Sequence, residues 1–139
     1  MFSKVLDLNK PFFEETLRML IETQFDFVAQ NPQLPMFVFR EILANPENRK
    51  WALSTFAPKL IPFFIALDKS LNEEIAKGTV RQMSVIHLLM NVLSMNISTF
   101  IAMPVLQEAF QLDKGEKMEK FLAERRESNV QFILNALRP

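Results

Sequence analysis

The feature that most constrains this chain is a run of twenty-six residues, Gln82 to Gln107, that contains no Asp, Glu, Lys or Arg. Charged residues make up 23% of the sequence, so a run of this length indicates a segment sheltered from water on most sides. It contains VIHLLMNVLSMNISTFIAMPVL. Three arrangements would shelter it: a membrane span, a contact between subunits, or the wall of a cavity for an apolar ligand.

The composition of the run argues against a membrane span. A span needs about twenty mostly apolar residues, and the run is long enough. However, six polar residues are distributed along its whole length: His87, Asn91, Ser94, Asn96, Ser98 and Thr99. No cluster of basic residues lies tightly at either end to fix an orientation. We therefore predict no membrane partner.

The polar residues of the run form two groups on a helical wheel of about 100° per residue. One narrow stripe consists of Ser84, His87, Asn91, Ser94 and Ser98. Asn96 and Thr99 lie on the far side of the helix. Buried polar groups need hydrogen-bond partners, and one small chain has difficulty in surrounding a helix completely. The pattern favours a second subunit, a lined cavity, or both, and leaves open which stripe faces which.

Composition and charge exclude several classes of protein. The 139 residues suffice for one domain, and 16 basic against 16 acidic residues give zero net charge, so this chain alone lacks the basic surface of a nucleic-acid binder. The absence of cysteine excludes disulfides and thiolate sites and suits a reducing compartment. The N-terminal sequence MFSKVLDLNKPFFEE has no signal-peptide pattern. We expect a cytoplasmic protein.

No catalytic constellation is present. The chain has one His and no Tyr, and it lacks a Ser-His-Asp set, a two-His metal motif and a Gly-rich phosphate loop. The paired carboxylates Glu73 and Glu74 follow Asn72 near the expected end of a helix, where a solvated role is the simpler interpretation. We predict that the protein is not an enzyme and has no catalytic residue, metal site or cofactor.

Proline and glycine divide the chain into about five helices, which predicts an all-α helical bundle with short connections. The expected helices span about 11–30, 32–44, 46–77, 84–102 and 116–137. Asn9, Asn31 and Asn45 are the predicted N-caps of the first three. The first helix is expected to bury the face that contains Phe13, Leu17, Leu20, Gln24 and Phe27.

Proline, glycine and capping residues also predict where the later helices bend, end or begin. Pro58 and Pro62 predict a kink or break near residues 57–62. Gly78 suits the position just after a helix, and Pro104 closes the uncharged helix. The sequence Asp113-Lys114-Gly115-Glu116 predicts a capping box at the start of the last helix.

The last helix supports the subunit interpretation of the uncharged run. Its apolar arc consists of Met118, Phe121, Leu122, Phe132, Ile133 and Ala136, with Arg125 and Asn129 in the middle. These two polar residues lie either at the edge of a surface helix or in a helix–helix seam, where such groups select a partner. In the second interpretation, the last two long helices of each subunit form a four-helix dimer interface.

Three segments resemble the C-terminal domain of TetR/AcrR-family transcriptional regulators. FDFVAQNPQLPMFVFREILANPE resembles two consecutive helices in which Asn-Pro, a second Pro and a Phe-rich stretch lead to Arg-Glu. KGTVRQMSVIHLLMNVLSMNISTFIAMPVL is similar to the family's basic turn and uncharged helix, and FLAERRESNVQFILNALRP to its closing helix. The resemblance covers about residues 25–138.

The resemblance implies an all-α domain that binds a small molecule and dimerises through its last two long helices. The family's N-terminal helix-turn-helix, which binds operator DNA, is missing from these residues, and its sequence pattern is absent. We expect residues 1–139 to be a single ligand-binding and dimerisation domain, with residues 1–9 the remnant of a connecting helix. Either the helix-turn-helix has been removed from a longer protein, of which operator DNA is then a partner, or the protein has lost DNA binding; we favour the first.

The implied function is that of an effector-binding, homodimerising domain that senses a small apolar or amphipathic molecule. The candidate ligand-binding residues are Phe37, Trp51, Phe56, Phe63, Phe64, Met83, His87, Met90, Asn91 and Met95. The candidate dimer-interface residues are Asn96, Thr99, Met103, Phe121, Leu122, Arg125, Asn129, Phe132 and Ile133. The alternative hypothesis is a helical lipid-binding or protein-docking module with no link to DNA.

Overall fold

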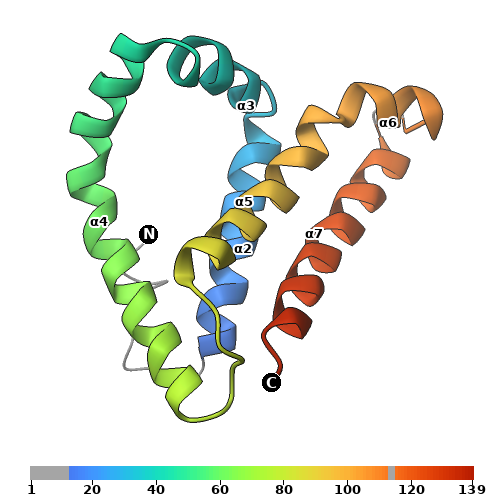
Figure 1. The fold of residues 1–139 in the computed structure, drawn as a ribbon. Coiled ribbons are helices and arrows are strands. Elements are labelled where there is room, and N and C mark those ends of the chain that lie inside the picture. The colour runs from blue at the N-terminus through green and yellow to red at the C-terminus, as the bar shows by residue number, and fades with distance from the viewer. Residues whose placement is uncertain (1–12, 113–114) are drawn as a thin grey trace.

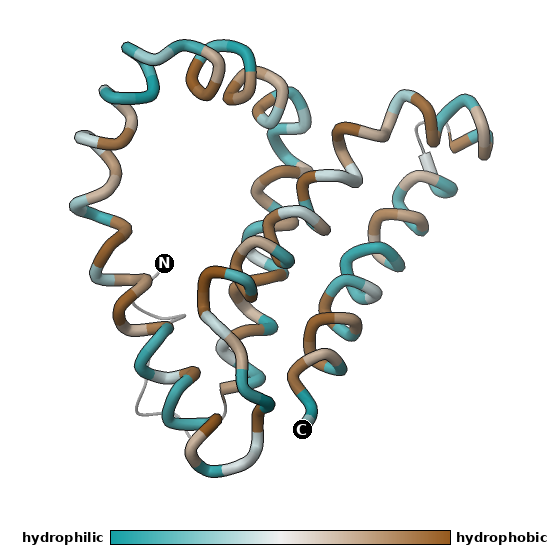
Figure 2. The backbone as a smooth tube through the Cα atoms, viewed as in Figure 1, coloured by the Kyte–Doolittle hydropathy of each residue, from teal (hydrophilic) through white to brown (hydrophobic). Residues whose placement is uncertain are grey.

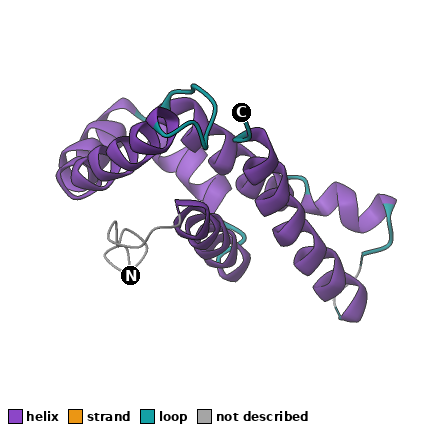
Figure 3. Ribbon diagram, turned by 90° about the horizontal axis from the view of Figure 1, so that it is seen from below, coloured by secondary structure: helices purple, strands orange, loops and turns teal. Residues whose placement is uncertain are grey.

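The computed structural model describes residues 13–112 and 115–139, and all regular structure in them is helical (Figures 1 and 3). The elements in chain order are α2 (Phe13–Gln30), α3 (Leu34–Phe37), the π-helical turn η1 (Val38–Leu43), α4 (Pro46–Ala76), α5 (Val85–Ile101), α6 (Met103–Ala109) and α7 (Glu116–Ala136). The all-α prediction is confirmed. Asn9 and Asp113, two of the predicted capping residues, lie outside the described residues.

The centre of the bundle is formed by α2, α5 and α7, which pack against one another (Figure 1). The C-terminal half of α4 joins them through Phe63, Leu67 and Leu71. The other members of this core are Phe13, Leu17, Ile21, Val80, Leu88, Val92, Val130, Ile133 and Leu137. Burial of these side chains supplies the main driving force for folding.

The buried face of α2 differs from the predicted one. The fully buried residues are Phe13, Leu17, Ile21, Phe25 and Val28, whereas Phe27 is 52% exposed. Two helices, α5 and α7, both pack over the side of α2 that contains Ile21 and Phe25, and Phe25 contacts Phe100 with ring centroids 5.2 Å apart. As a result, the buried face of α2 contains Ile21 and Phe25, and Phe27 stays exposed.

The segment after α2 corrects one capping prediction and confirms another. The Asn31 side chain donates to the carbonyl of Phe27 at 2.9 Å, so it caps the end of α2 and not the start of the next helix. The second proline, Pro35, occupies the first turn of α3, and a π-helical turn follows in place of a single helix over 32–44. Asn45 caps α4 as predicted, since its Oδ1 accepts from the backbone of Glu47 and Asn48.

Of the kink or break predicted near Pro58 and Pro62, the break is absent. The helix continues for 31 residues through Pro58 and Pro62, and Figure 1 shows it as a bowed helix. The two prolines are one turn apart, so the backbone bonds they remove lie on nearly the same side, where the helix bends without ending.

Gly78 terminates α4 as predicted. It has φ +80°, a left-handed conformation that favours glycine. Its backbone N–H donates to the carbonyl of Ile75, and that of Thr79 to the carbonyl of Glu74. The pair of bonds satisfies carbonyls that the end of a helix leaves without partners.

The uncharged run contains two helices and not one. The side chain of Ser84 caps α5 by accepting from the N–H of Ile86, and α5 ends at Ile101. Pro104 then occupies the first turn of α6, a short helix that the sequence analysis missed. No single helix in the described residues is long and apolar enough to cross a membrane; α5 and α6 pass such a test only as a pair, and a bend of 54° separates them.

Ion pairs fasten α2 to α7 on the outside of the core. Arg126 makes two hydrogen bonds to the carboxylate of Asp26 and one to Glu22, each 2.9 Å long. Arg18 donates to both carboxylate oxygens of Glu127 at 2.9 and 3.1 Å, and these hydrogen bonds lower the pKa of Glu127. Paired, planar contacts of this kind fix the register of the two helices.

Candidate ligand-binding and subunit-contact sites

Two candidate interface residues, Asn96 and Asn129, lie in the interior of the single chain. Both have no exposed surface. The Asn96 amide donates to the carbonyl of Ile21 at 3.0 Å and to Oε1 of Gln24 at 2.8 Å. The Asn129 amide donates to Oδ1 of Asn96 at 2.9 Å, so the chain of bonds joins α2, α5 and α7. A side chain enclosed in this way has no surface to offer to a partner.

The other candidate interface residues fall into three groups. Ile133 and Thr99 are also buried in the chain, at 2% and 4% exposed, and Met103 and Leu122 pack against the small cluster around Phe25 and Phe100. Phe132 is 66% exposed. Phe121 and Arg125, together with Thr99, line an open cavity. Of the nine residues proposed for the seam, Phe132 is the one large apolar side chain that the described structure leaves mostly free.

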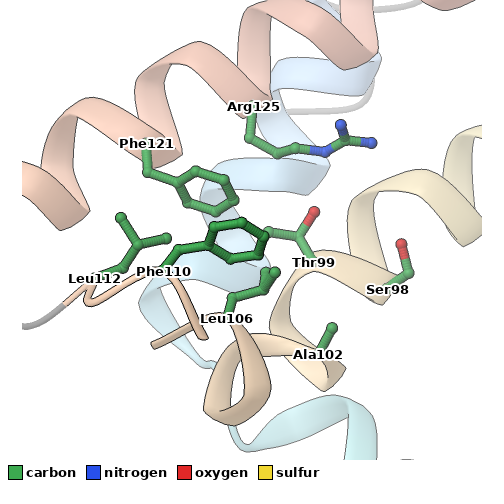
Figure 4. A pocket seen from close by; sticks show the side chains of 8 residues that line it. All are labelled: Ser98, Thr99, Ala102, Leu106, Phe110, Leu112, Phe121 and Arg125. Atoms are coloured by element: carbon green, nitrogen blue, oxygen red, sulfur yellow. The ribbon is translucent and has the colours of Figure 1, made fainter. Parts of the chain in front are cut away.

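The cavity lies where the C-terminal end of α5, α6 and the first turns of α7 meet (Figure 4). Its volume is about 580 Å³. The lining residues are Ser98, Thr99, Ala102, Leu106, Phe110, Leu112, Phe121 and Arg125. This volume falls in the range of about 300–1,000 Å³ that is usual for small-molecule sites.

Arg125 is the charged residue of the cavity, and it differs from Arg126 and Arg18 in its lack of a carboxylate partner among the described residues. Arg126 is held by Asp26 and Glu22, and Arg18 is held by Glu127. The described residues give Arg125 no hydrogen-bond or ion-pair partner, and its side chain is half-buried. A guanidinium in this position presents several donors to the cavity without a counter-ion.

The candidate ligand-binding residues divide between the core and the surface. Phe63 is buried in the core, and Met83 and Met95 pack against it. Phe37, Trp51, Phe56, Phe64 and Met90 are between 38% and 58% exposed. His87 and Asn91 are exposed on α5. The structure therefore does not bring these ten residues together in one enclosed pocket, and three of them serve the interior.

The exposed members of this set belong to a larger apolar surface, which we call the arch. The arch consists of α3, η1 and residues 46–65 of α4; α3 contacts α5, whereas Figure 1 shows the upper part of α4 standing away from α2 and α5. Its large exposed apolar residues are Met36, Phe37, Phe39, Leu43, Trp51, Leu53, Phe56, Leu60, Ile61, Phe64 and Ile65. In Figure 2 hydrophobic positions recur between hydrophilic ones along α4 after its hydrophilic first turn.

The apolar face of α4 is continuous from the arch into the core. Leu53, Phe56, Leu60 and Phe64 recur at helical spacing and lie on the same side of the helix as the buried Leu67 and Leu71. The lower part of this face is covered by the bundle, whereas the upper part is not. The exposed residues of α5 also include an apolar stripe: Ile86, Met90, Leu93 and Ile101.

The sequence analysis missed the cavity between α5, α6 and α7 because it treated residues 103–112 as a turn. The signal was present, since Val105, Leu106 and Phe110 follow Pro104 at helical spacing. In the described residues, no group of three His, Asp or Glu side chains lies close enough to hold a metal ion.

The described residues form an all-α bundle with the arch on one side and a cavity where α5, α6 and α7 meet. No protein-family model matches this chain, and no curated protein matches it.

Proposed function

We propose that this chain is the effector-binding and homodimerisation domain of a TetR-like transcriptional regulator that senses a small apolar or amphipathic molecule. The observation that carries the proposal is the arch, where eleven large apolar side chains are at least 37% exposed. Four of them, Leu53, Phe56, Leu60 and Phe64, form one continuous strip on the inner side of α4, whereas Trp51, Ile61 and Ile65 lie on its other side. An exposed apolar strip of this kind is typical of a ligand or partner site.

In this proposal the effector binds between the arch and α5. The inward face of α4 contributes Phe56, Leu60 and Phe64, and Met90 belongs to the exposed apolar stripe of α5. An apolar effector bound there would favour one position of α4 over another. Only a difference in affinity for the two positions can drive such a change.

The dimerisation half rests on the outer faces of α5 and α7. Ser98 and Arg125 line the same cavity, so the stripes to which they belong face the same side of the molecule. The α5 stripe contains the exposed His87, Asn91 and Ser94, and the α7 stripe continues to Phe132. Two such faces, brought together around a two-fold axis, would form a four-helix contact with Phe132 as its apolar anchor.

Nile red, an uncharged apolar dye that fluoresces on leaving water, provides the test of the ligand half. The dye should bind the wild-type chain, and Met90→Trp should abolish binding because the larger ring fills the space beside α5. Met19→Trp is the matched control, since Met19 is exposed on the outer side of α2. Equal dye binding by the wild type and Met90→Trp would show that the effector site is not there.

Light scattering at micromolar concentration separates the proposal from its alternative. A mass of two chains is expected. A monomer would contradict the regulator proposal and would favour a helical lipid-binding or protein-docking module, whose apolar arch needs no second copy. The reading frame upstream of Met1 gives a second check, because a regulator requires a helix-turn-helix there.

A further inference from the structure

We propose that the cavity between α5, α6 and α7 is a second ligand site, separate from the arch, which binds a single-chain anionic amphiphile with its carboxylate on Arg125. The cavity is built by one chain alone. The site therefore forms without a second copy, although Ser98 and Arg125 also belong to the α5 and α7 stripes of the proposed dimer face, so a dimer would lie beside it.

The cavity has a polar side and an apolar side (Figure 4). The guanidinium of Arg125 and the hydroxyl oxygens of Thr99 and Ser98 lie toward one side of it. Phe110, Phe121, Leu106 and Leu112 lie on the other. A ligand that fits both sides must itself have a polar head and a hydrocarbon tail.

The charges around the cavity select an anionic head. None of the eight lining residues is acidic, and Arg125 has no partner among the described residues. A carboxylate would accept two parallel hydrogen bonds from its guanidinium. Both hydroxyls now make long bonds of 3.3 Å to the carbonyl of Met95, and each can rotate to donate to a carboxylate instead. A single arginine suits the single charge of a carboxylate.

The apolar wall gives the reason for a tail. Phe110 is 68% exposed although it belongs to the wall, so a hydrocarbon chain would remove its ring from water. Gln111, which separates Phe110 from Leu112, has φ +54°, a conformation that residues other than glycine seldom adopt. This conformation ends α6, since the N–H of Leu112 donates to the carbonyl of Gln107, and it brings Leu112 to the cavity wall.

Isothermal titration calorimetry with decanoate, below its micelle concentration, tests the proposal. The wild-type chain should bind decanoate more tightly than octanoate, by about fourfold for each added methylene that is buried. Arg125→Gln should weaken decanoate binding at least tenfold, because it removes a charge-assisted pair of hydrogen bonds. Decanol, which has the same tail and no charge, should bind wild type and Arg125→Gln equally, and this equality also shows that the variant is folded.

Two further variants make the result decisive. Arg40→Gln removes an exposed charge from η1, away from the cavity, and should leave decanoate binding unchanged. Ala102→Trp fills the cavity and should abolish binding of both decanoate and decanol. The proposal is overturned if decanoate fails to bind, if Arg125→Gln binds it as well as the wild type does, or if Ala102→Trp leaves it bound. In the last two cases the amphiphile occupies the arch, which leaves the proposed function intact.

Discussion

At the scale of single residues, the buried amides of Asn96 and Asn129 give the bundle its most specific contact. The two side chains and Gln24 form a line of hydrogen bonds through the core. The Oδ1 of Asn129 is buried and has no hydrogen-bond partner among the described residues. Removing one amide leaves the other unsatisfied, whereas removing both leaves an apolar contact of similar shape.

Replacement of these two asparagines is therefore expected to be non-additive. Asn96→Leu and Asn129→Leu should each lower the free energy of unfolding by about 1–3 kcal/mol, because each strands the polar atoms of the other residue. The double variant should lose less than the sum of the two, by about 0.5–3 kcal/mol. Urea denaturation followed by circular dichroism measures all three values, and strict additivity would show that the two amides act separately.

At the scale of elements, α4 combines a packed half with an exposed half. Its lower part is fixed by Phe63, Leu67 and Leu71, and its upper part carries both Pro58 and the apolar face of the arch. Few packing contacts hold the upper part of α4 in place. Its helical structure therefore depends mainly on its backbone hydrogen bonds. Pro58 removes one of these bonds, the one that an N–H at this position would make to the carbonyl of Ser54.

Pro58→Ala should therefore order the arch without changing the core. A helix-interior proline is disfavoured by about 3 kcal/mol relative to alanine. Hydrogen exchange of the amides in residues 51–60 should slow, while exchange in α5 should not change. Pro46→Ala is the matched control, because Pro46 stands in the first turn of α4, where its missing N–H has no helical partner. Unchanged exchange in Pro58→Ala would mean that the upper part of α4 opens for another reason.

At the scale of the whole molecule, apolar surface is distributed unevenly. The core of α2, α5 and α7 is tightly enclosed, whereas the arch and the outer face of α7 are not. Phe132 is 66% exposed and lies two turns after Arg125 on the same side of α7. A large exposed aromatic ring beside polar residues is typical of the anchor of a subunit contact.

If the chain forms the proposed dimer, Phe132→Lys should convert it to a monomer, since it introduces a charge at the centre of the proposed seam. The circular dichroism spectrum should stay helical, because the Phe132 ring contributes little to the core. Phe27→Lys is the matched control, since Phe27 is 52% exposed on α2 and lies away from the seam; it should leave the mass of two chains unchanged. If both variants remain dimeric, the seam lies on another face.

The helical periodicity and the capping residues were sufficient to predict much of the fold. Asn45, Ser84 and Gly78 end or begin helices through bonds to residues within six positions of themselves, so local sequence contains the necessary information. Asn31 was misjudged, and the outcome at Pro58 was left open between a kink and a break, because the local sequence allows two outcomes at each position. Asn31 can cap the helix before or after it, and a proline can break or only bend a helix.

The sites were harder to predict than the helices. Sequence alone predicted that residues 82–107 leave water on most sides, because a run without charge favours burial. In the single chain only one face of α5 is buried, through Leu88, Val92 and Asn96, while Ile86, Met90 and Ile101 stay exposed. Only the tertiary structure decided that the Asn129 amide donates to Asn96 inside one chain, that α6 turns away from α5, and that Arg125 faces a cavity. Hydrogen bonding and burial across the bundle depend on which helices meet. That choice is made by packing among residues far apart in sequence, which no local pattern records.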